Sequence, residues 1–321
     1  VNRPVRRQDV PGAAPRPLFW NAMSDPVPSL SSALPEPIDA DAPGLSVIVI
    51  AKNEARRIEA CLRACAFADE RIVLDSGSTD DTRALARACG ARVHTSDDWP
   101  GFGPQKNRAL ALSRGRWVLS IDADEVVSPE LRAAILAAVA RGDEARQPVA
   151  WWVRRASSFC GRVVRFGDWR NDRVVRLFRR DRARFSDDVV HERVVVDVGG
   201  DGGRGGRGGG TIGTLDGVLW HDSVESIAVG RRKMRHYARL GAAKLRARGK
   251  GGFASACGQA WWTFTRGYLV RLGFLDGWRG LVIAWLNTQG TFLRYRWAAM
   301  PASRTPDLGE EAIDGGRDPQ P

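Results

Sequence analysis

A series of short apolar runs, each followed by a helical pattern, constrains most strongly how the first half of the chain folds. Leu45–Ala51 and Trp117–Ile121 are apolar runs rich in Val and Ile, a pattern typical of strands buried on both faces of a sheet. Shorter runs at 71–74 and 91–95 lie between them. Strands that alternate with helices at intervals of roughly 20–30 residues predict βαβ units and a parallel sheet. The sequence therefore predicts an α/β fold.

Polar residues follow three of these strands at their carboxyl ends. They form the clusters Lys52–Glu54, Asp75–Asp81 and Asp122–Glu125. Parallel sheets bind their ligands at the carboxyl ends of the strands. Because three clusters fall at such ends, we expect one ligand site at this edge of the sheet.

The third cluster places the carboxylates of Asp122, Asp124 and Glu125 at the end of a buried strand. Such groups repel one another and are costly to desolvate, and a hard divalent cation is the usual compensation. In an extended chain Asp122 and Asp124 point to the same side, so both can face one metal or a metal-bound diphosphate. The alternative is a polar turn in which Asp124 or Ser128 caps a helix that begins near Pro129.

The second half of the chain follows a different pattern. Its strands are shorter and separated by turns, which predicts an antiparallel or mixed extension of the sheet; they are expected at 150–154, 163–166, 173–178, 191–198 and 211–220. Residues 199–210 are nearly all Gly, Arg and Asp and are expected to form a flexible insertion. Residues 1–43, where Met23 offers a start, and the tail 301–321 are predicted to be disordered.

Positive charge is concentrated in the C-terminal third. The chain has 49 Lys and Arg against 37 Asp and Glu. Between 230 and 300 there are fourteen Lys and Arg but only one acid, Asp276, and aromatic residues alternate with the basic ones. Aromatic and basic residues on helices interrupted by glycine are typical of helices at a membrane interface. Helices that pack on the rest of the chain with a solvated basic face are the alternative.

Other features bear on the compartment and the partners. Five cysteines without a C-x-x-C pair predict reduced thiols in a cytoplasmic protein. The sequence contains neither a secretory signal nor an apolar run of about 18 residues, so no spanning helix is expected. No recognisable nucleic-acid-binding module accompanies the basic segment, so nucleic acid is not an expected partner.

Several stretches resemble a known family. V-I-V-I-A-K-N-E (47–54), L-D-S-G-S-T-D-D-T (74–82), K-N (106–107) and S-I-D-A-D-E (120–125) resemble the signatures of family 2 glycosyltransferases of GT-A fold. R-L-F-R-R (176–180), V-H-E (190–192) and G-F-L-D-G (273–277) resemble one branch, which contains the lipopolysaccharide-core β-glucosyltransferases. The resemblance covers about 45–298. It implies a Rossmann-like nucleotide-sugar transferase domain over 44–223 with a mixed-sheet extension. The basic and aromatic residues that follow predict amphipathic membrane-associating helices over 224–300.

The resemblance implies a nucleotide-sugar site made by Ala51, Asn53, Glu54, Asp75, Lys106 and Asp122. Asp75 is similar in position to the family aspartate that accepts a hydrogen bond from uracil, which favours a UDP-sugar; the alternative is a turn residue. Asn53 would hold its loop, and the alternative is a cap on the following helix; the two roles are compatible. Lys106 would neutralise the diphosphate, and the alternative is a solvated lysine.

The resemblance also implies a metal site. Asp124 would coordinate the cation that bridges the two phosphates, with Asp122 contacting ribose or metal and His221 as a further candidate ligand. Mg²⁺ or Mn²⁺ suits such an oxygen-rich site, where it would stabilise the departing UDP.

Inverting transfer needs a base that takes the proton from the attacking hydroxyl. Glu192 is the first choice and Asp188 the second, while His191 would orient substrate or bind metal. Trp169 and Arg176 are expected to hold the acceptor sugar and its phosphates.

These inferences predict a metal-dependent, inverting hexosyltransferase. It would move a hexose, with glucose the first expectation, from a UDP-sugar to a lipid-linked saccharide such as lipopolysaccharide core. It would act peripherally, on the anionic inner face of a bacterial inner membrane. The alternatives are a glycosyltransferase of another glycolipid or capsule pathway, a nucleotidyltransferase, and a non-catalytic basic protein that binds membrane or RNA.

Overall fold

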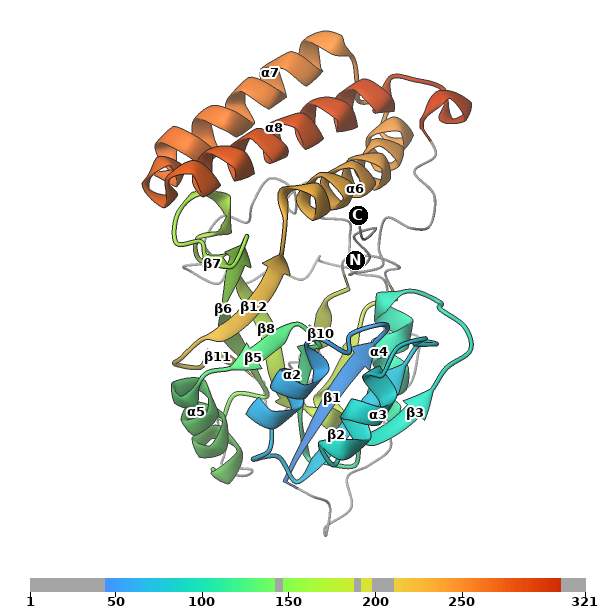
Figure 1. The fold of residues 1–321 in the computed structure, drawn as a ribbon, viewed down its shortest axis with the longest axis vertical. Helices are drawn as coiled ribbons and strands as arrows, with labels where there is room; N and C mark the ends of the chain where they lie inside the picture. The colour runs from blue at the N-terminus through green and yellow to red at the C-terminus, as the bar shows by residue number, and fades with distance from the viewer. Residues whose placement is uncertain (1–43, 142–146, 188–191, 198–210, 307–321) are drawn as a thin grey trace, which may run out of the picture.

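A parallel sheet occupies the first half of the chain, as the sequence predicts. The computed structural model describes residues 44–141, 147–187, 192–197 and 211–306 (Figure 1). Four strands lie side by side in the order β3-β2-β1-β4 and all pair in parallel: β1 (Leu45–Ala51), β2 (Glu70–Asp75), β3 (Arg92–Thr95) and β4 (Trp117–Asp122). The α/β fold is therefore confirmed.

Helices cover both faces of this sheet, which explains why its strands are apolar throughout. Leu45, Val47 and Val49 of β1 pack into a core shared with α2 (Ile58–Ala64), α3 (Thr82–Ala88) and α5 (Pro129–Ala140). Ile48 points to the other face, into a core shared with α4 (Phe102–Ala111). Successive side chains of a strand alternate between faces, so a strand covered on both sides must be apolar at every position.

The expected extension is mixed. β8 (Arg173–Arg179) pairs antiparallel with β4 and β6 (Ala150–Phe159), and β11 (Ile212–Thr214) and β12 (Leu219–Val224) both pair in parallel with β6. The remaining short strands are β5 (Glu125–Val127), β7 (Arg162–Val163), β9 (Ala183–Phe185) and β10 (Val194–Val196).

Three predicted strands are shorter than expected. Residues 163–166 hold only the end of β7, which is followed by a 3₁₀ turn at Gly167–Trp169. The strand expected at 191–198 spans 194–196, and the one expected at 211–220 is divided into β11 and β12. The region also contains a second 3₁₀ turn, Arg180–Arg182.

Three helices form a separate layer beyond the extension (Figure 1): α6 (Ile227–Ala247), α7 (Phe253–Phe264) and α8 (Trp278–Ala298). A π-helical turn (Thr265–Val270) and a 3₁₀ turn (Gly273–Asp276) connect α7 to α8. Ala238 and Ala242 of α6 share an apolar cluster with Trp297 of α8, because small side chains let the two helices approach closely. Within the described residues, no helix combines the length and apolarity needed to cross a bilayer.

The helical layer shares a core with the sheet extension. Phe159, Val164 and Val224 pack in one cluster with Met234 of α6 and Ile283 of α8. The predicted boundary at 223/224 therefore falls inside β12, in a region where the two parts pack together, and it stays a prediction.

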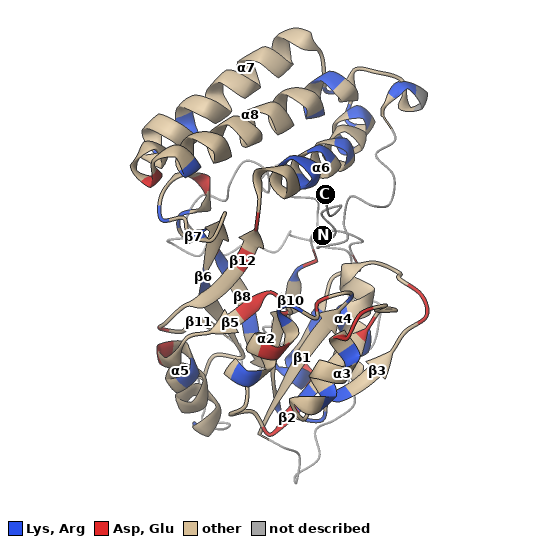
Figure 2. Cartoon of the chain, in the orientation of Figure 1, with Lys and Arg blue, Asp and Glu red and all other residues tan. Residues whose placement is uncertain are grey.

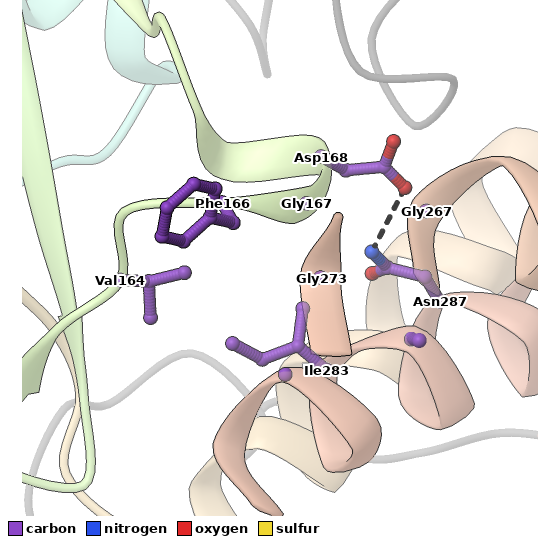
Figure 3. Close-up of a pocket in the computed structure, with 10 residues that line it drawn as sticks. Val164, Phe166, Gly167, Asp168, Gly267, Gly273, Ile283 and Asn287 are labelled. Atoms are coloured by element: carbon purple, nitrogen blue, oxygen red, sulfur yellow. Dashed lines mark hydrogen bonds between the residues drawn. The ribbon is translucent and has the colours of Figure 1, made fainter. Parts of the chain in front are cut away.

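A buried carboxylate fastens the layer to the loop after β7. Asp168 is 4 % exposed and accepts hydrogen bonds from Arg266 (2.8 Å), Arg271 (2.7 Å) and Asn287 (3.4 Å). Figure 3 shows Asp168 and Asn287 facing each other across this junction. The cavity beside them has a volume of about 10 Å³, which is room for one water molecule. It is a packing gap rather than a substrate pocket.

The G-F-L-D-G stretch makes the second fastening. Asp276 accepts hydrogen bonds from the backbone N–H groups of Arg165 (3.2 Å) and Phe166 (2.8 Å). A Cβ on Gly280 would overlap the carbonyl oxygen of Gly273, so glycine is needed for this close approach. The one acid of the basic segment therefore points inward.

The chain ends differ in part from the prediction. Residues 1–43, 199–210 and 307–321 lie outside the described residues, so their predicted disorder is not tested. Ala302–Arg304 forms a 3₁₀ turn, and Arg246 donates a hydrogen bond to Thr305 at 2.9 Å. Order therefore continues beyond residue 300, where the tail was predicted to be disordered.

Candidate functional site

The three polar clusters lie at one edge of the sheet, as predicted. In the strand register Ala51 of β1 is opposite Asp75 of β2, and Ile50 is opposite Asp122 of β4. The loops that follow these strands therefore surround a common site. The polar side chains of these loops form three groups. The first is a set of hydrogen bonds that connects two loops, and the other two are clusters of charged residues.

Asn53 locks the first loop to the second. Its backbone has φ 56°, its N–H donates to Ser78 Oγ (2.9 Å), and its side-chain oxygen accepts from the N–H of Thr79 (2.9 Å). Helix α2 begins five residues later, with Arg57 at the N-cap position. Asn53 therefore holds the loop, and the alternative that it caps the helix is wrong.

Asp75 completes this lock. The residue is fully buried, and its carboxylate accepts hydrogen bonds from both the N–H (3.0 Å) and the hydroxyl of Ser78. The neighbouring backbone is fixed as well, because the carbonyl of Ala51 accepts from Ser76 N (2.8 Å). These contacts agree with the turn alternative for Asp75, and its contact with uracil stays a prediction.

The inner cluster consists of Asp122, Glu125, Lys106, Arg155 and Arg176. Asp122 contacts Lys106 (2.8 Å) and Arg176 (2.6 Å), while the fully buried Glu125 contacts Arg176 (2.5 Å) and Arg155 (3.4 Å). Burial by itself raises the pKa of Asp122, but the charges of Arg176 and Lys106 outweigh it and hold that pKa well below its usual range. In the inner cluster each carboxylate is therefore paired with two cations.

Besides Asp122, two further predicted ligand-binding residues belong to the inner cluster. The side chain of Lys106 is 3 % exposed and also contacts Glu192 at 2.6 Å, so the alternative of a solvated lysine is wrong. Arg176 is also buried, with its contacts made to Asp122 and Glu125. In this arrangement the positive charge of Arg176 compensates those two carboxylates, so we do not assign Arg176 to binding of the acceptor.

The outer cluster consists of Asp124, His221, Glu54, Arg57 and Asp222. Asp124 Oδ2 lies 3.3 Å from His221 Nε2, and the other ring nitrogen of His221 lies 2.9 Å from Ser157 Oγ. Burial raises the pKa of Asp124, but the interaction with His221 outweighs it, so the pKa is lowered overall. The two side chains are partly exposed and form an acidic and imidazole pair at the edge of the sheet.

Glu54 is the unusual carboxyl group of the outer cluster. It lies 3.2 Å from Arg57, which also contacts Asp222 at 3.3 Å and Glu225. Burial, followed by the negative charge of Asp124, raises the pKa of Glu54 to about 7. This group is therefore poised to change its charge near neutral pH.

The expected sharing of one cation by Asp122 and Asp124 does not match this geometry. The oxygens of Asp122 face Lys106 and Arg176, whereas Asp124 faces His221. Among the described residues, no three His, Cys, Asp or Glu side chains are arranged to hold a metal ion. Asp124 and His221 do fit a cation that takes its other ligands from phosphate and water, as Mg²⁺ commonly does.

The remaining predicted residues are placed as follows. Asp188 and His191 lie outside the described residues. Glu192 is described and lies at this edge of the sheet through its contact with Lys106. Trp169 is half-buried and packs edge-to-face on Phe159 (6.1 Å between ring centres) at the junction with the helices, so its acceptor role stays a prediction.

Sequence reasoning missed the counter-ions. Arg57 and Arg155 carry no motif, and their partners Asp222 and Glu125 lie 165 and 30 residues away. The one available signal was Glu125 itself, since a buried carboxylate at a strand end requires a cation.

Comparisons with known proteins find relatives of this chain in sequence. The family model described as Glycosyl transferase family 2 matches residues 46–191. An uncharacterized glycosyltransferase of Rickettsia typhi is 30 % identical over 262 residues, which are 78 % of this chain and 85 % of the relative. The lipopolysaccharide core biosynthesis glycosyltransferase LpsC of Rhizobium meliloti is 32 % identical over 156 residues, 47 % of this chain and 57 % of that protein.

A solved structure also matches. Glucosyl-3-phosphoglycerate synthase from Mycobacterium tuberculosis, in complex with Mn²⁺, UDP and glucosyl-3-phosphoglycerate, has 31 % sequence identity and a TM-score of 0.30. The match covers 36 % of this chain and 44 % of the solved chain, so it spans less than half of either protein.

Proposed function

The chain belongs to glycosyl transferase family 2, and we propose that it moves a hexose, with glucose the first candidate, from a UDP-sugar to a lipid-linked saccharide. The observation that carries the proposal is the Asp124–His221 pair at the carboxyl edge of the parallel sheet, beside the loops locked by Asn53. The similarity to the core biosynthesis enzyme LpsC supports a saccharide of the cell envelope as the acceptor.

In this proposal the nucleotide occupies the edge formed by Ala51, Asn53, Glu54 and Asp75. Mg²⁺ or Mn²⁺, held by Asp124 and His221, would supply charge stabilisation for the UDP that departs. The chain itself orients the donor through rigid loops, since Asn53 and Asp75 fix both loops by hydrogen bonds.

Glu192 is the proposed base, with Asp188 as the second candidate and His191 as an orienting residue. The carboxylate of Glu192 takes the proton from the acceptor hydroxyl. The oxygen of that hydroxyl attacks the anomeric carbon of the donor sugar from the side opposite the diphosphate. The bond between that carbon and the diphosphate oxygen breaks, and its electrons leave with UDP. The configuration of the sugar is inverted as a result.

The test is transfer by the purified protein from a panel of UDP- and GDP-sugars to truncated core lipid acceptors, read by mass spectrometry. We expect one hexose to be added from a UDP-sugar, with release of one UDP. Transfer from GDP-sugars alone would exclude the UDP assignment, and transfer only to acceptors of another glycolipid or capsule would move the enzyme to that pathway. Absence of turnover and of nucleotide-sugar binding would favour a non-catalytic protein.

The helical layer supports a peripheral site on the inner face of a bacterial inner membrane. Figure 2 shows α7 without charged residues, in contrast to α6. Large apolar side chains are exposed along α7, the two turns after it and the first half of α8: Phe253, Trp261, Trp262, Leu269, Val270, Leu272, Phe274, Leu275, Trp278, Leu281 and Trp285. We name this set the apolar face; exposed apolar surface rich in Trp is typical of proteins at a lipid interface.

Several basic residues that were expected to contact lipid point inward instead. Arg266 and Arg271 contact Asp168. Arg279 donates hydrogen bonds to the backbone carbonyls of Phe159 and Cys160. Arg246 donates a hydrogen bond to the backbone carbonyl of Trp297. We therefore assign docking mainly to the apolar face, with the exposed charges of α6 in a secondary, salt-sensitive role.

Vesicle co-sedimentation over a salt series tests this assignment. We expect Trp261→Ser combined with Trp262→Ser to weaken binding to anionic vesicles at all salt concentrations. Arg231→Gln combined with Arg235→Gln is the matched pair on α6, where both residues are exposed, and should weaken binding only at low salt. If the unaltered protein ignores anionic vesicles at low salt, the membrane proposal fails.

A further inference from the structure

One lysine of the basic segment is directed toward the candidate site. Lys233, in the second turn of α6, is half-buried, and its Nζ donates a hydrogen bond to the carbonyl of Ser223 at 2.8 Å. Arg231 and Arg235, two residues before and after it, are exposed. Lys233 thus differs from its basic neighbours, which the sequence grouped together as a docking surface.

Strand β12 connects this lysine to the outer cluster. Three consecutive residues of β12 make the connection: His221 contacts Asp124, the N–H of Asp222 donates to the carbonyl of Asp124 (2.9 Å), and Ser223 accepts from Lys233. Helix α6 begins four residues after Ser223, with Ser226 as its N-cap. The carboxylate of Asp124 and the ammonium group of Lys233 are therefore held against the same short strand.

The electrostatics agree with this placement. Burial lowers the pKa of Lys233, while the negative charges of Asp124, Glu54 and Asp222 oppose that shift and Arg57 adds to it. An ammonium group has three donors, and the hydrogen bond to Ser223 goes to a neutral oxygen. This contrasts with Lys106, which makes direct ion pairs with Asp122 and Glu192.

A residue in the next turn of α6 also faces the candidate site. Tyr237 lies four residues after Lys233, on the same face of the helix. Burial raises the pKa of Tyr237, and the negative charges of Glu192 and Asp124 contribute to the rise. This face of α6 therefore borders the site, although the helix belongs to the segment that the sequence assigned to the membrane.

We propose that Lys233 binds the diphosphate of the nucleotide donor, so that α6 contributes to the donor site beside the outer cluster. The role rests on the proposed function, because it presupposes a nucleotide diphosphate beside Asp124. A lysine is a flexible point charge suited to phosphate. Held beside a bound diphosphate, it offsets the negative charge that develops on UDP as the sugar departs.

Binding of UDP and uridine separates a phosphate contact from a structural one. The full-length protein in Mg²⁺ buffer is titrated with UDP by calorimetry and with uridine by ligand-observed NMR. We expect Lys233→Met to weaken UDP binding by roughly tenfold or more, the usual range for a charged hydrogen bond, and to leave uridine binding within about twofold. Lys233→Arg should restore part of the UDP affinity. Arg235→Met is the matched control on an exposed position of the same helix, and should bind UDP like the unaltered protein.

The outcomes are distinguishable. Equal losses for UDP and uridine, or a fall in melting temperature with unchanged UDP affinity, would make Lys233 a structural residue and overturn the proposal. Unchanged UDP affinity without any loss of stability would overturn it as well. If the unaltered protein binds no UDP, the proposed function itself fails, and the role of Lys233 fails with it.

Discussion

The inner and outer clusters use neighbouring residues of one turn but compensate their charge in opposite ways. In the inner cluster, Asp122 and Glu125 are bound by Arg176 at 2.6 and 2.5 Å, with Lys106 and Arg155 as further cations. In the outer cluster, Asp124 contacts only the imidazole of His221 directly among the ion pairs of the described residues.

We interpret this difference as one between charge that stabilises the fold and charge that is available to a ligand. Carboxylates that are fully paired with Arg and Lys gain little from a further cation, and removing one partner of the fully buried Glu125 exposes a large desolvation penalty. A carboxylate that faces an imidazole, as Asp124 faces His221, can still accept a cation or a phosphate-bound metal. We therefore assign stability to the inner cluster and ligand binding to the outer cluster. Four substitutions test this assignment, taken from the largest expected effect to the smallest.

Glu192 tests the assignment most severely, because it contacts the inner Lys106 and is also the proposed base. We expect Glu192→Gln to lower transfer by about 10²–10⁴-fold, the usual range for a general base, with UDP-sugar binding retained. Steady-state transfer and calorimetry measure the two quantities. If Glu192→Gln transfers normally while Asp188→Asn does not, the base is Asp188 and Glu192 belongs to the inner, structural set.

Arg176→Met removes the cation that the inner carboxylates share. Asp122 and Glu125 would keep one weaker partner each, so we expect a loss of about 3–5 kcal/mol in the free energy of unfolding. Urea denaturation measures this loss. Arg173→Met is the matched control, because Arg173 lies exposed on the same strand β8 and should change the value by less than about 0.5 kcal/mol. A comparably small effect at Arg176 would contradict the structural assignment.

Asp124→Ala tests the outer cluster. We expect turnover to fall by at least about 100-fold, because the stabilisation of the leaving diphosphate is lost, while the urea midpoint changes little. Treatment with EDTA should abolish transfer by the unaltered protein, and added Mg²⁺ or Mn²⁺ should restore it. Asp216→Ala, at an exposed position before β12, serves as the control. Full activity in EDTA would remove the metal from the proposal.

The strands and the edge at which the polar clusters meet were predictable because their signals are local. The continuous Val and Ile runs of β1 and β4 reveal burial on both faces, and a parallel sheet brings the strand ends together whatever their separation in sequence. The loop role of Asn53 was also predicted, together with a compatible capping role that the structure assigns to another position, Arg57. The strands after residue 147 were less well placed, since short strands in a mixed sheet depend on their partners.

The division of the carboxylates was not predictable from spacing. Side chains two residues apart point to the same side of a strand, so Asp122 and Asp124 would share a side if the chain stayed extended. The chain does not stay extended, because Ala123 and Asp124 form a turn between β4 and β5. Asp122 meets Glu125 instead, through Arg176 from β8. The inward direction of Lys233 was hidden for a similar reason, since composition counts charges without showing which way a helix faces.

The smallest expected effect concerns the titration of Glu54. Because its folded-state pKa is about 7 against an ordinary value of 4.5, the folded protein holds a proton there that the unfolded chain releases. The stability linked to this proton is fully present below pH 4.5 and is lost as the pH rises through about 7. With the side chain 20 % exposed, we expect a contribution on the order of 2 kcal/mol.

Between pH 5 and 8 the unaltered protein should therefore lose more stability in urea titrations than Glu54→Gln, which cannot ionise. Glu59→Gln, in an exposed pair with Arg63, should behave like the unaltered protein. If Glu54→Gln shows the same slope, the outer cluster holds its carboxylates ionised as the inner cluster does, and the contrast between the two is lost.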